Sequence, residues 1–123
     1  MNSFENLEVW QEARKFVLYV YQLQSRFPAF EKFGLCDQIR RAAISIPSNI
    51  AEGSGRRAWK DKVRFIEYAY GSLMEVYCQL ILANDLNYLE QCELDDARTS
   101  VEHISRMLSG LKSSFERMSG NQP

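Results

Sequence analysis

Glycine and proline are scarce in this sequence, which has six glycines and three prolines among 123 residues. A chain with so few turn-forming residues has few tight connections, so its regular elements are expected to be long. No stretch alternates apolar and polar residues as a half-buried strand does, whereas apolar residues recur at steps of three and four. The scarcity of turn residues therefore favours a few long helices.

Membrane and secretion signals are also missing. No run of 18 apolar residues is present, which excludes a transmembrane helix. The opening residues, MNSFENLEVW, lack the basic and apolar regions of a signal peptide. Three cysteines without a CxxC pair fit reduced thiols better than a disulfide framework. We therefore expect a cytoplasmic protein that does not bind a membrane.

Residue patterns that would support catalysis or metal binding are few. His103 is the only histidine, and neither a GxSxG turn nor the Glu-x-x-His pattern of di-iron bundles is present. The segment GSGR lacks the spacing and the lysine of a phosphate-binding loop. We expect no catalytic residue, no metal and no cofactor, and hence a protein that is not an enzyme.

Apolar periodicity predicts four helices in a single domain that spans residues 1–123. We expect them at residues 6–26, 31–52 and 59–85, with a fourth whose apolar row runs from Leu94 to Met118. That last row repeats in steps of three and four and requires a partner surface along its whole length. Short connections between long amphipathic helices predict an all-α, antiparallel up-and-down four-helix bundle, with a frayed tail at residues 119–123.

The second predicted helix contains Pro47. Its apolar row passes through the proline without losing phase, and a loop would not keep that register. The proline ring removes the hydrogen bond to the carbonyl of Ala43, at a cost of about 3 kcal/mol in a helix interior. We therefore predict one helix, kinked at Pro47, which the glycines of residues 53–55 bring to an end. The row consists of Leu35, Ile39, Ala42, Ile46 and Ile50.

Polar side chains also follow a helical row on this second segment. One interpretation is a solvated helix face, which is the common fate of polar rows. Against it, small residues such as Ala42, Ala43 and Ser48 permit another backbone to approach closely, so an interface between subunits is equally compatible. The candidate interface residues are Gln38, Arg41, Ser45, Ser48, Asn49 and Glu52.

Positive charge is concentrated in one part of the chain. Residues 26–64 carry nine Lys or Arg against four Asp or Glu, a net charge of +5, although the whole chain has a net charge of −1. Arginine forks pair with phosphate oxygens, and the neighbouring Trp59 and Phe65 suit base stacking. The alternative is a solvated helix start with local ion pairs. The candidate nucleic-acid-binding residues are Arg40, Arg41, Arg56, Arg57, Lys60, Lys62 and Arg64.

Several long motifs resemble one bacterial family. The segment DQIRRAAISIPSNIAEGSGR, followed by GSLMEVYCQL and the NYL turn, resembles the 23S rRNA-intervening sequence proteins, as do the earlier LEVWQEA and FPAFEKFGL. The resemblance covers roughly residues 4–115. Positions that match the family pattern are Gln38, Arg40, Arg41, Ser45, Pro47, Asn49, Glu52, Gly53, Arg56, Gly71, Ser72 and Glu75.

The resemblance implies an antiparallel four-helix bundle that assembles as a homopentamer. The sequence is also similar to the accessory proteins of diversity-generating retroelements, which bind nucleic acid through basic surfaces and work with a reverse transcriptase. Two segments depart from the family pattern: GRRAWKDK replaces the expected start of the third helix, and Cys78 replaces a small hydroxyl residue. The acidic totals outside residues 26–64 weaken the transfer of nucleic-acid binding from the more basic relatives.

We therefore expect a non-enzymatic homo-oligomer whose basic surface binds RNA or single-stranded DNA, or a nucleoprotein complex. The alternative is a protein-interaction scaffold without direct nucleic-acid binding, whose partner is a protein such as a reverse transcriptase. In that case the polar row from Arg41 to Glu52 is a network between subunits.

Overall fold

The computed structural model describes residues 3–120, and its regular elements are all helical. Two short 3-10 helices, η1 (Phe4–Asn6) and η2 (Ala29–Glu31), accompany four long helices. These are α1 (Glu8–Gln24), α2 (Leu35–Gly55), α3 (Trp59–Asp85) and α4 (Gln91–Gly120). The predicted all-α class and the number of long helices are confirmed, and α3 has the predicted bounds.

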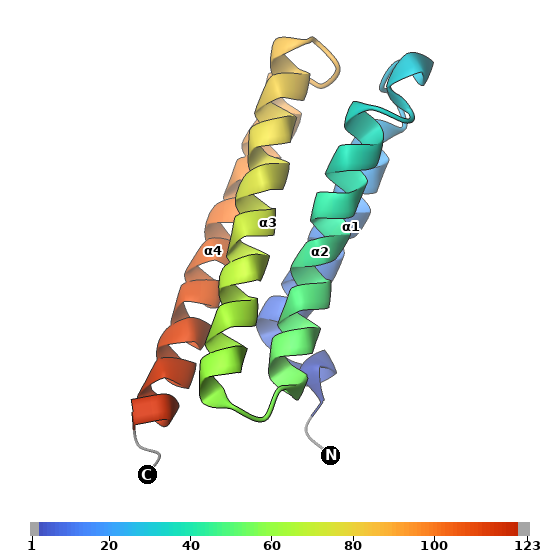
Figure 1. Cartoon of the computed structure of the whole chain (residues 1–123). Helices are drawn as coiled ribbons and strands as arrows, with labels where there is room; N and C mark the ends of the chain where they lie inside the picture. The colour runs from blue at the N-terminus through green and yellow to red at the C-terminus, as the bar shows by residue number, and fades with distance from the viewer. Residues whose placement is uncertain (1–2, 121–123) are drawn as a thin grey trace.

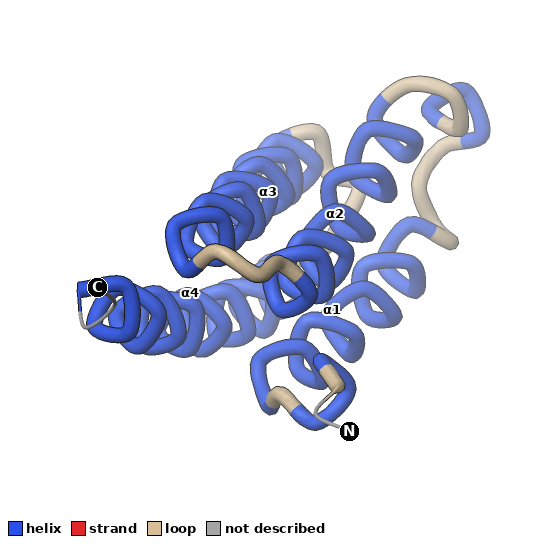
Figure 2. Tube along the Cα trace, turned by 60° about the horizontal axis from the view of Figure 1, so that its bottom comes forward, coloured by secondary structure: helices blue, strands red, loops and turns tan. Residues whose placement is uncertain are grey.

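The four long helices lie side by side around one core. Each contacts its neighbours in chain order, and α4 closes the arrangement by contacting α1. In Figure 1 the chain runs up α1, down α2, up α3 and down α4. Figure 2 shows the helices at the four corners of the bundle, with α2 and α4 diagonally opposite. Both the start of η1 and the end of α4 therefore lie at the end of the bundle that carries the α2–α3 turn.

The core consists of the predicted apolar rows, because a row at helical spacing is buried only against other helices. Ile39, Ile46 and Ile50 of α2 are fully buried, and Leu73 and Leu80 of α3 face them from the same core. Tyr70, whose spacing from Ile66 and Leu73 fits the apolar row of α3, is instead 45% exposed. The reason is that alanines and valines complete the row from positions closer to the centre of the bundle: Ala69, Val76 and Ala83.

Helix α2 continues through Pro47 and ends later than predicted. It extends to Gly55, because Gly53 lies inside the helix and is buried against α3. A Cβ atom at position 53 would lie 3.0 Å from the Cβ of Phe65 and 3.2 Å from the Lys62 carbonyl oxygen. Gly53 therefore permits close packing of two helices and does not stop one. The kink predicted at Pro47 stays a prediction.

The α3–α4 turn is a Schellman motif, in which a residue of positive φ follows the helix and the last carbonyls accept bonds from beyond it. Asn87 has φ 65°, a conformation that asparagine tolerates better than most residues. The amide of Tyr88 donates to the Ala83 carbonyl at 2.9 Å, and that of Asn87 donates to the Asn84 carbonyl at 2.9 Å. Leu89 is buried directly afterwards, which fixes the start of the return path into α4.

Two further expectations concern the C-terminal tail and the absence of a transmembrane helix. Of the tail expected to fray, Ser119 and Gly120 lie in the last turn of α4, and residues 121–123 lie outside the described residues. None of the helices within residues 3–120 has the length and apolar content that crossing a bilayer requires.

Candidate nucleic-acid interface and subunit face

The seven candidate basic residues occupy two separate places. Arg40 and Arg41 lie in the first half of α2, whereas the other five surround the α2–α3 turn. At about 1.5 Å per residue, Arg41 and Gly55 are roughly 21 Å apart along the helix axis. The structure therefore does not form a single patch from all seven. The five at the turn are Arg56, Arg57, Lys60, Lys62 and Arg64.

Both arginines of the first group have partners within the chain. Arg40 is half-buried, and its guanidinium donates to the Lys32 carbonyl at 3.1 Å and to Oε1 of Gln24 at 3.5 Å. Arg41 is exposed and pairs with Asp37 one turn earlier, at 3.2 Å. The contacts of Arg40 connect α1, the loop before α2 and α2 itself, so its role in the structure is internal.

Two arginines at the turn form ion pairs across one helical turn. Arg56 pairs with Glu52 at 3.2 Å, and Arg64 pairs with Asp61 at 3.0 Å. Both guanidinium groups also lie over the ring of Phe65, at 4.6 Å for Arg56 and 5.8 Å for Arg64. Phe65 is consequently covered by cations of its own chain and does not offer a free stacking face.

Lys62 is directed into the bundle. Its Nζ donates to the Ser54 carbonyl at 2.9 Å and lies 5.4 Å and 5.6 Å from the ring centres of Trp59 and Phe115. Burial lowers the pKa of Lys62, because removing an ammonium group from water penalises its charged form. A cation at the last carbonyls of a helix also opposes the negative end of the helix dipole. Lys62 therefore caps α2.

Arg57 and Lys60 have the opposite character. Both are exposed, and neither forms an ion pair or a side-chain hydrogen bond with any part of the chain between residues 3 and 120. They flank Trp59, which is half-buried and packs against Phe115 at 6.0 Å between ring centres. Of the seven candidates, these two present charge most directly to a ligand.

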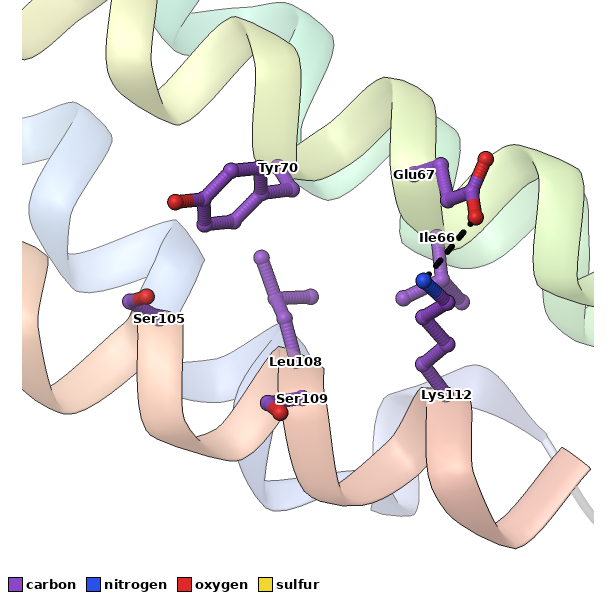
Figure 3. A pocket seen from close by; sticks show the side chains of 7 residues that line it. All are labelled: Ile66, Glu67, Tyr70, Ser105, Leu108, Ser109 and Lys112. Atoms are coloured by element: carbon purple, nitrogen blue, oxygen red, sulfur yellow. Dashed lines mark ion pairs between the residues drawn. The ribbon is translucent and has the colours of Figure 1, made fainter. Parts of the chain in front are cut away.

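Helix α4 contributes a cation that the sequence did not suggest. Lys112 pairs with Glu67 at 3.0 Å, and the hydrogen bond to this carboxylate raises the pKa of Lys112. The pair closes one end of a cleft of about 480 Å³ between α3 and α4, with Leu108 at its floor and Tyr70 at its other end (Figure 3). Lys112 lies far along the chain from the residues of the α2–α3 turn. Only the packing of α3 on α4 brings Lys112 close to α3.

The predicted polar row on α2 is divided by α3. Gln38, Arg41, Ser48 and Glu52 are exposed, whereas Ser45 and Asn49 are half-buried at the α2–α3 seam. The hydroxyl groups of Ser45 and Ser72 are 2.8 Å apart. The amide nitrogen of Asn49 donates to both the carbonyl and the hydroxyl of Ser45, each at 2.8 Å. Part of the row therefore joins α2 to α3, and the rest faces outward.

An open groove of about 820 Å³ follows this seam. On its α3 side the most exposed large apolar side chain is Tyr68, 52% exposed, which is followed one turn later by Gly71. Further along the same exposed row of α3 come Cys78 and Leu82, and Leu82 is 49% exposed. The groove residues are Ser45, Asn49, Glu67, Tyr68, Gly71, Ser72, Met74 and Glu75.

Gly71 is exposed in the interior of α3, and a Cβ atom there would meet nothing within 4 Å. A glycine in a helix interior costs about 1 kcal/mol relative to alanine. Packing within the chain does not require this glycine, unlike Gly53. The missing side chain leaves open space on this face of α3.

Candidate metal-binding groups, His103 and the buried thiol are the other features that bear on catalysis or metal binding. Across residues 3–120, no group of three or more His, Cys, Asp or Glu is placed to hold a metal ion. His103 is exposed at the edge of a cleft of about 400 Å³ between α1 and α4. Cys36 is buried, and this burial raises its pKa, which disfavours the reactive thiolate.

Comparison with known proteins identifies the family of the chain. A search of curated proteins found no significant match. The family model described as 23S rRNA-intervening sequence protein matches residues 5–110, which include α1, α2, α3 and most of α4. The chain therefore belongs to the 23S rRNA-intervening sequence protein family.

Proposed function

We propose that the protein is a non-enzymatic homo-oligomer, a pentamer of antiparallel four-helix bundles, that binds RNA or single-stranded DNA through its α2–α3 turns. The observation that carries the binding proposal is the exposure of Arg57 and Lys60 at one turn of every subunit, without an internal ion pair. Two such cations bind a polyanion weakly in a monomer. An assembly of identical subunits multiplies them.

The oligomeric part of the proposal rests on the groove at the α2–α3 seam. Gly71 and the small residues Ser45 and Ser72 lower the surface there, so that a helix of another subunit can approach closely. Tyr68 and Leu82 supply apolar area along the same side of α3. The outward residues of the α2 row, Arg41, Ser48 and Glu52, extend this face. The pentameric number itself rests on the resemblance to the family.

A substitution at Gly71 tests the subunit face. We expect Gly71→Ala to weaken assembly, because the added methyl group occupies the space of closest approach. The same change should stabilise the isolated helix by about 1 kcal/mol. The matched control is Gly110→Ala on α4, since a Cβ atom at that exposed glycine also meets nothing within 4 Å. Light scattering over a range of protein concentrations should show dissociation of the first variant alone. Equal assembly of both variants would place the subunit interface elsewhere.

A charge reversal at the turn tests nucleic-acid binding. We expect Arg57→Glu combined with Lys60→Glu to reduce the affinity for single-stranded RNA by about tenfold or more, and to make the dependence on salt less steep. The control reverses two other exposed arginines, Arg14 on α1 and Arg106 on α4. Fluorescence anisotropy at several salt concentrations measures both quantities. The proposal fails if the intact oligomer does not bind RNA at low salt, or if both variants lose affinity equally.

The alternative function is a protein-interaction scaffold without nucleic-acid binding, with a partner such as a reverse transcriptase. Ion pairs within the chain favour it, because Arg41, Arg56 and Arg64 already have carboxylate partners. Charge reversal of Arg41 separates the two functions. Dissociation of the oligomer by Arg41→Glu supports a network between subunits, whereas an intact oligomer that loses RNA supports a binding face.

A further inference from the structure

The end of the bundle opposite the α2–α3 turn has a different chemistry. It consists of the loop of residues 25–34, which contains η2, and the α3–α4 turn (Figure 1). Residues 75–97 contain six acidic residues and no Lys or Arg. The α2–α3 turn, by contrast, has five cations within residues 56–64. The molecule is therefore electrically polar along its length.

Large apolar side chains stand exposed at this acidic end. Phe33 is 86% exposed and Phe30 is 77% exposed, the highest values for large apolar residues between residues 3 and 120. Leu86, in the adjacent α3–α4 turn, is 52% exposed. Two neighbouring aromatic side chains in water are costly, and such surfaces commonly mark a place where another molecule binds.

The loop that carries the two phenylalanines is held by contacts on both of its sides. Oε2 of Glu31 accepts a hydrogen bond from the Tyr88 hydroxyl at 2.9 Å, and Oε1 accepts one from the amide of Leu35 at 3.3 Å. Phe27 is buried and packs on Tyr88, with 5.4 Å between ring centres. The phenylalanines thus belong to an anchored segment, which reduces the entropy that a partner must remove on binding.

The two segments at this end, residues 26–34 and 84–93, contain two cations and four acidic residues, a net charge of −2. Arg26 pairs with Glu93, and Lys32 lies 5.4 Å from the ring centre of its neighbour Phe33. Asp85 and Glu90 are exposed and have no ion pair with any described part of the chain. The net charge that this end presents to a ligand is therefore negative, although the exposed Lys32 lies beside Phe33. This net charge repels nucleic acid and anionic lipid headgroups.

We propose that this end is a docking surface for a basic amphipathic segment of a partner protein. Apolar side chains of the partner cover Phe30, Phe33 and Leu86, while its Lys or Arg side chains pair with Asp85 and Glu90. Aromatic anchors within a charged rim are the usual composition of a protein-binding hot spot. This surface is separate from the α2–α3 turn, so the inference holds whether or not that turn binds RNA.

A labelled peptide provides the test with the full-length protein. The probe is a fluorescein-labelled helical peptide of about 20 residues, in which leucines form one face and lysines the other. The matched probe replaces every lysine by glutamate. Anisotropy should show binding of the lysine peptide alone. In nuclear magnetic resonance spectra, the largest amide shifts should fall in residues 27–34 and 84–92. Shifts concentrated elsewhere would overturn the proposal.

Paired variants separate this surface from general attraction to negative charge. We expect Phe30→Ser combined with Phe33→Ser, and Asp85→Asn combined with Glu90→Gln, each to weaken peptide binding by about tenfold. The apolar control replaces Leu18 and Tyr21, which are exposed on α1, by serine; the charge control is Glu102→Gln with Glu116→Gln on α4. Both controls should change the affinity less than twofold.

Three outcomes would reject the proposal. In the first, the acidic substitutions weaken binding but the phenylalanine substitutions do not, which indicates charge attraction alone. In the second, the controls weaken binding as much as the paired variants do. In the third, the wild-type protein sediments with phosphatidylcholine–phosphatidylglycerol vesicles and the phenylalanine variant does not, which assigns the surface to lipid. Thermal unfolding within a few degrees of wild type verifies that each variant is folded.

Discussion

Gly53 and Gly71 are both interior glycines of helices, yet their surroundings give them opposite roles. The space for a Cβ atom at position 53 is already filled by α3, whereas at position 71 it is open. A sequence shows only that a helix contains a glycine. Whether the residue ends the helix, permits packing or leaves a surface free depends on the neighbouring helix. For this reason the predicted helix end at residue 52 was wrong: Gly53 lies inside α2, which ends at Gly55.

The packing at Gly53 gives a prediction for stability. We expect Gly53→Ala to lower the free energy of unfolding by about 1–3 kcal/mol, because the new methyl group meets backbone and Cβ atoms that cannot rotate away. The gain in helix propensity of about 1 kcal/mol offsets part of this cost. Urea unfolding of the variant and of the Gly110→Ala control measures the difference. A variant as stable as that control would show that α2 and α3 separate at no cost.

Lys62 illustrates why individual roles within a charged cluster are not visible in the sequence. Its neighbours Lys60 and Arg64 each lie two positions away, and all three have the same sign of charge. Helical geometry sends them in different directions, so that Lys62 reaches the end of α2 while Lys60 faces water. Composition identified the basic region, but only the packing of α2, α3 and α4 determines whether each cation contacts the chain or faces water.

At the scale of the helices, the apolar row of α4 is covered unevenly. The members of this row from Leu94 to Leu108 are buried. Leu111 and Phe115 are half-buried, and Met118 is 49% exposed. The cause is length, since α4 has 30 residues and α1 only 17, so α1 cannot follow α4 to its end. The expected partner surface therefore continues as far as Phe115, which packs against Trp59, but does not reach Met118.

This gradient predicts a matching gradient of mutational effects. We expect Leu108→Ala to destabilise the protein by about 2–5 kcal/mol, whereas Met118→Ala should change the stability by less than about 0.5 kcal/mol. Chemical unfolding of both variants, measured at one protein concentration, provides the comparison. A large loss on substitution of Met118 would indicate that another subunit covers the end of α4.

At the scale of the whole molecule, the helical class and the number of long helices were predictable because buried residues repeat at helical spacing in every segment. Ile39, Ile46 and Ile50 needed no tertiary information for this assignment. The positions of charged and exposed apolar side chains on the surface were less predictable. Arg40 and Arg56 belong to one basic stretch of sequence, but α2 holds them far apart. Likewise, the loop that carries Phe33 and the turn that carries Leu86 are far apart in the sequence, and the Glu31–Tyr88 hydrogen bond joins them.

The short α1 also has a consequence for how the protein opens. Its contact with α4 is the least extensive between consecutive corners of the bundle, whereas α2 and α3 share the most extensive one. Stability is not uniform in a folded chain, and elements with fewer buried neighbours detach at a lower free energy. Amide hydrogens of α1 should therefore exchange with solvent deuterium sooner than those of α2 and α3. A bundle that opens between α1 and α4 exposes Phe16 and Ile104 first. The α2–α3 pair, with its turn and outer groove, stays intact.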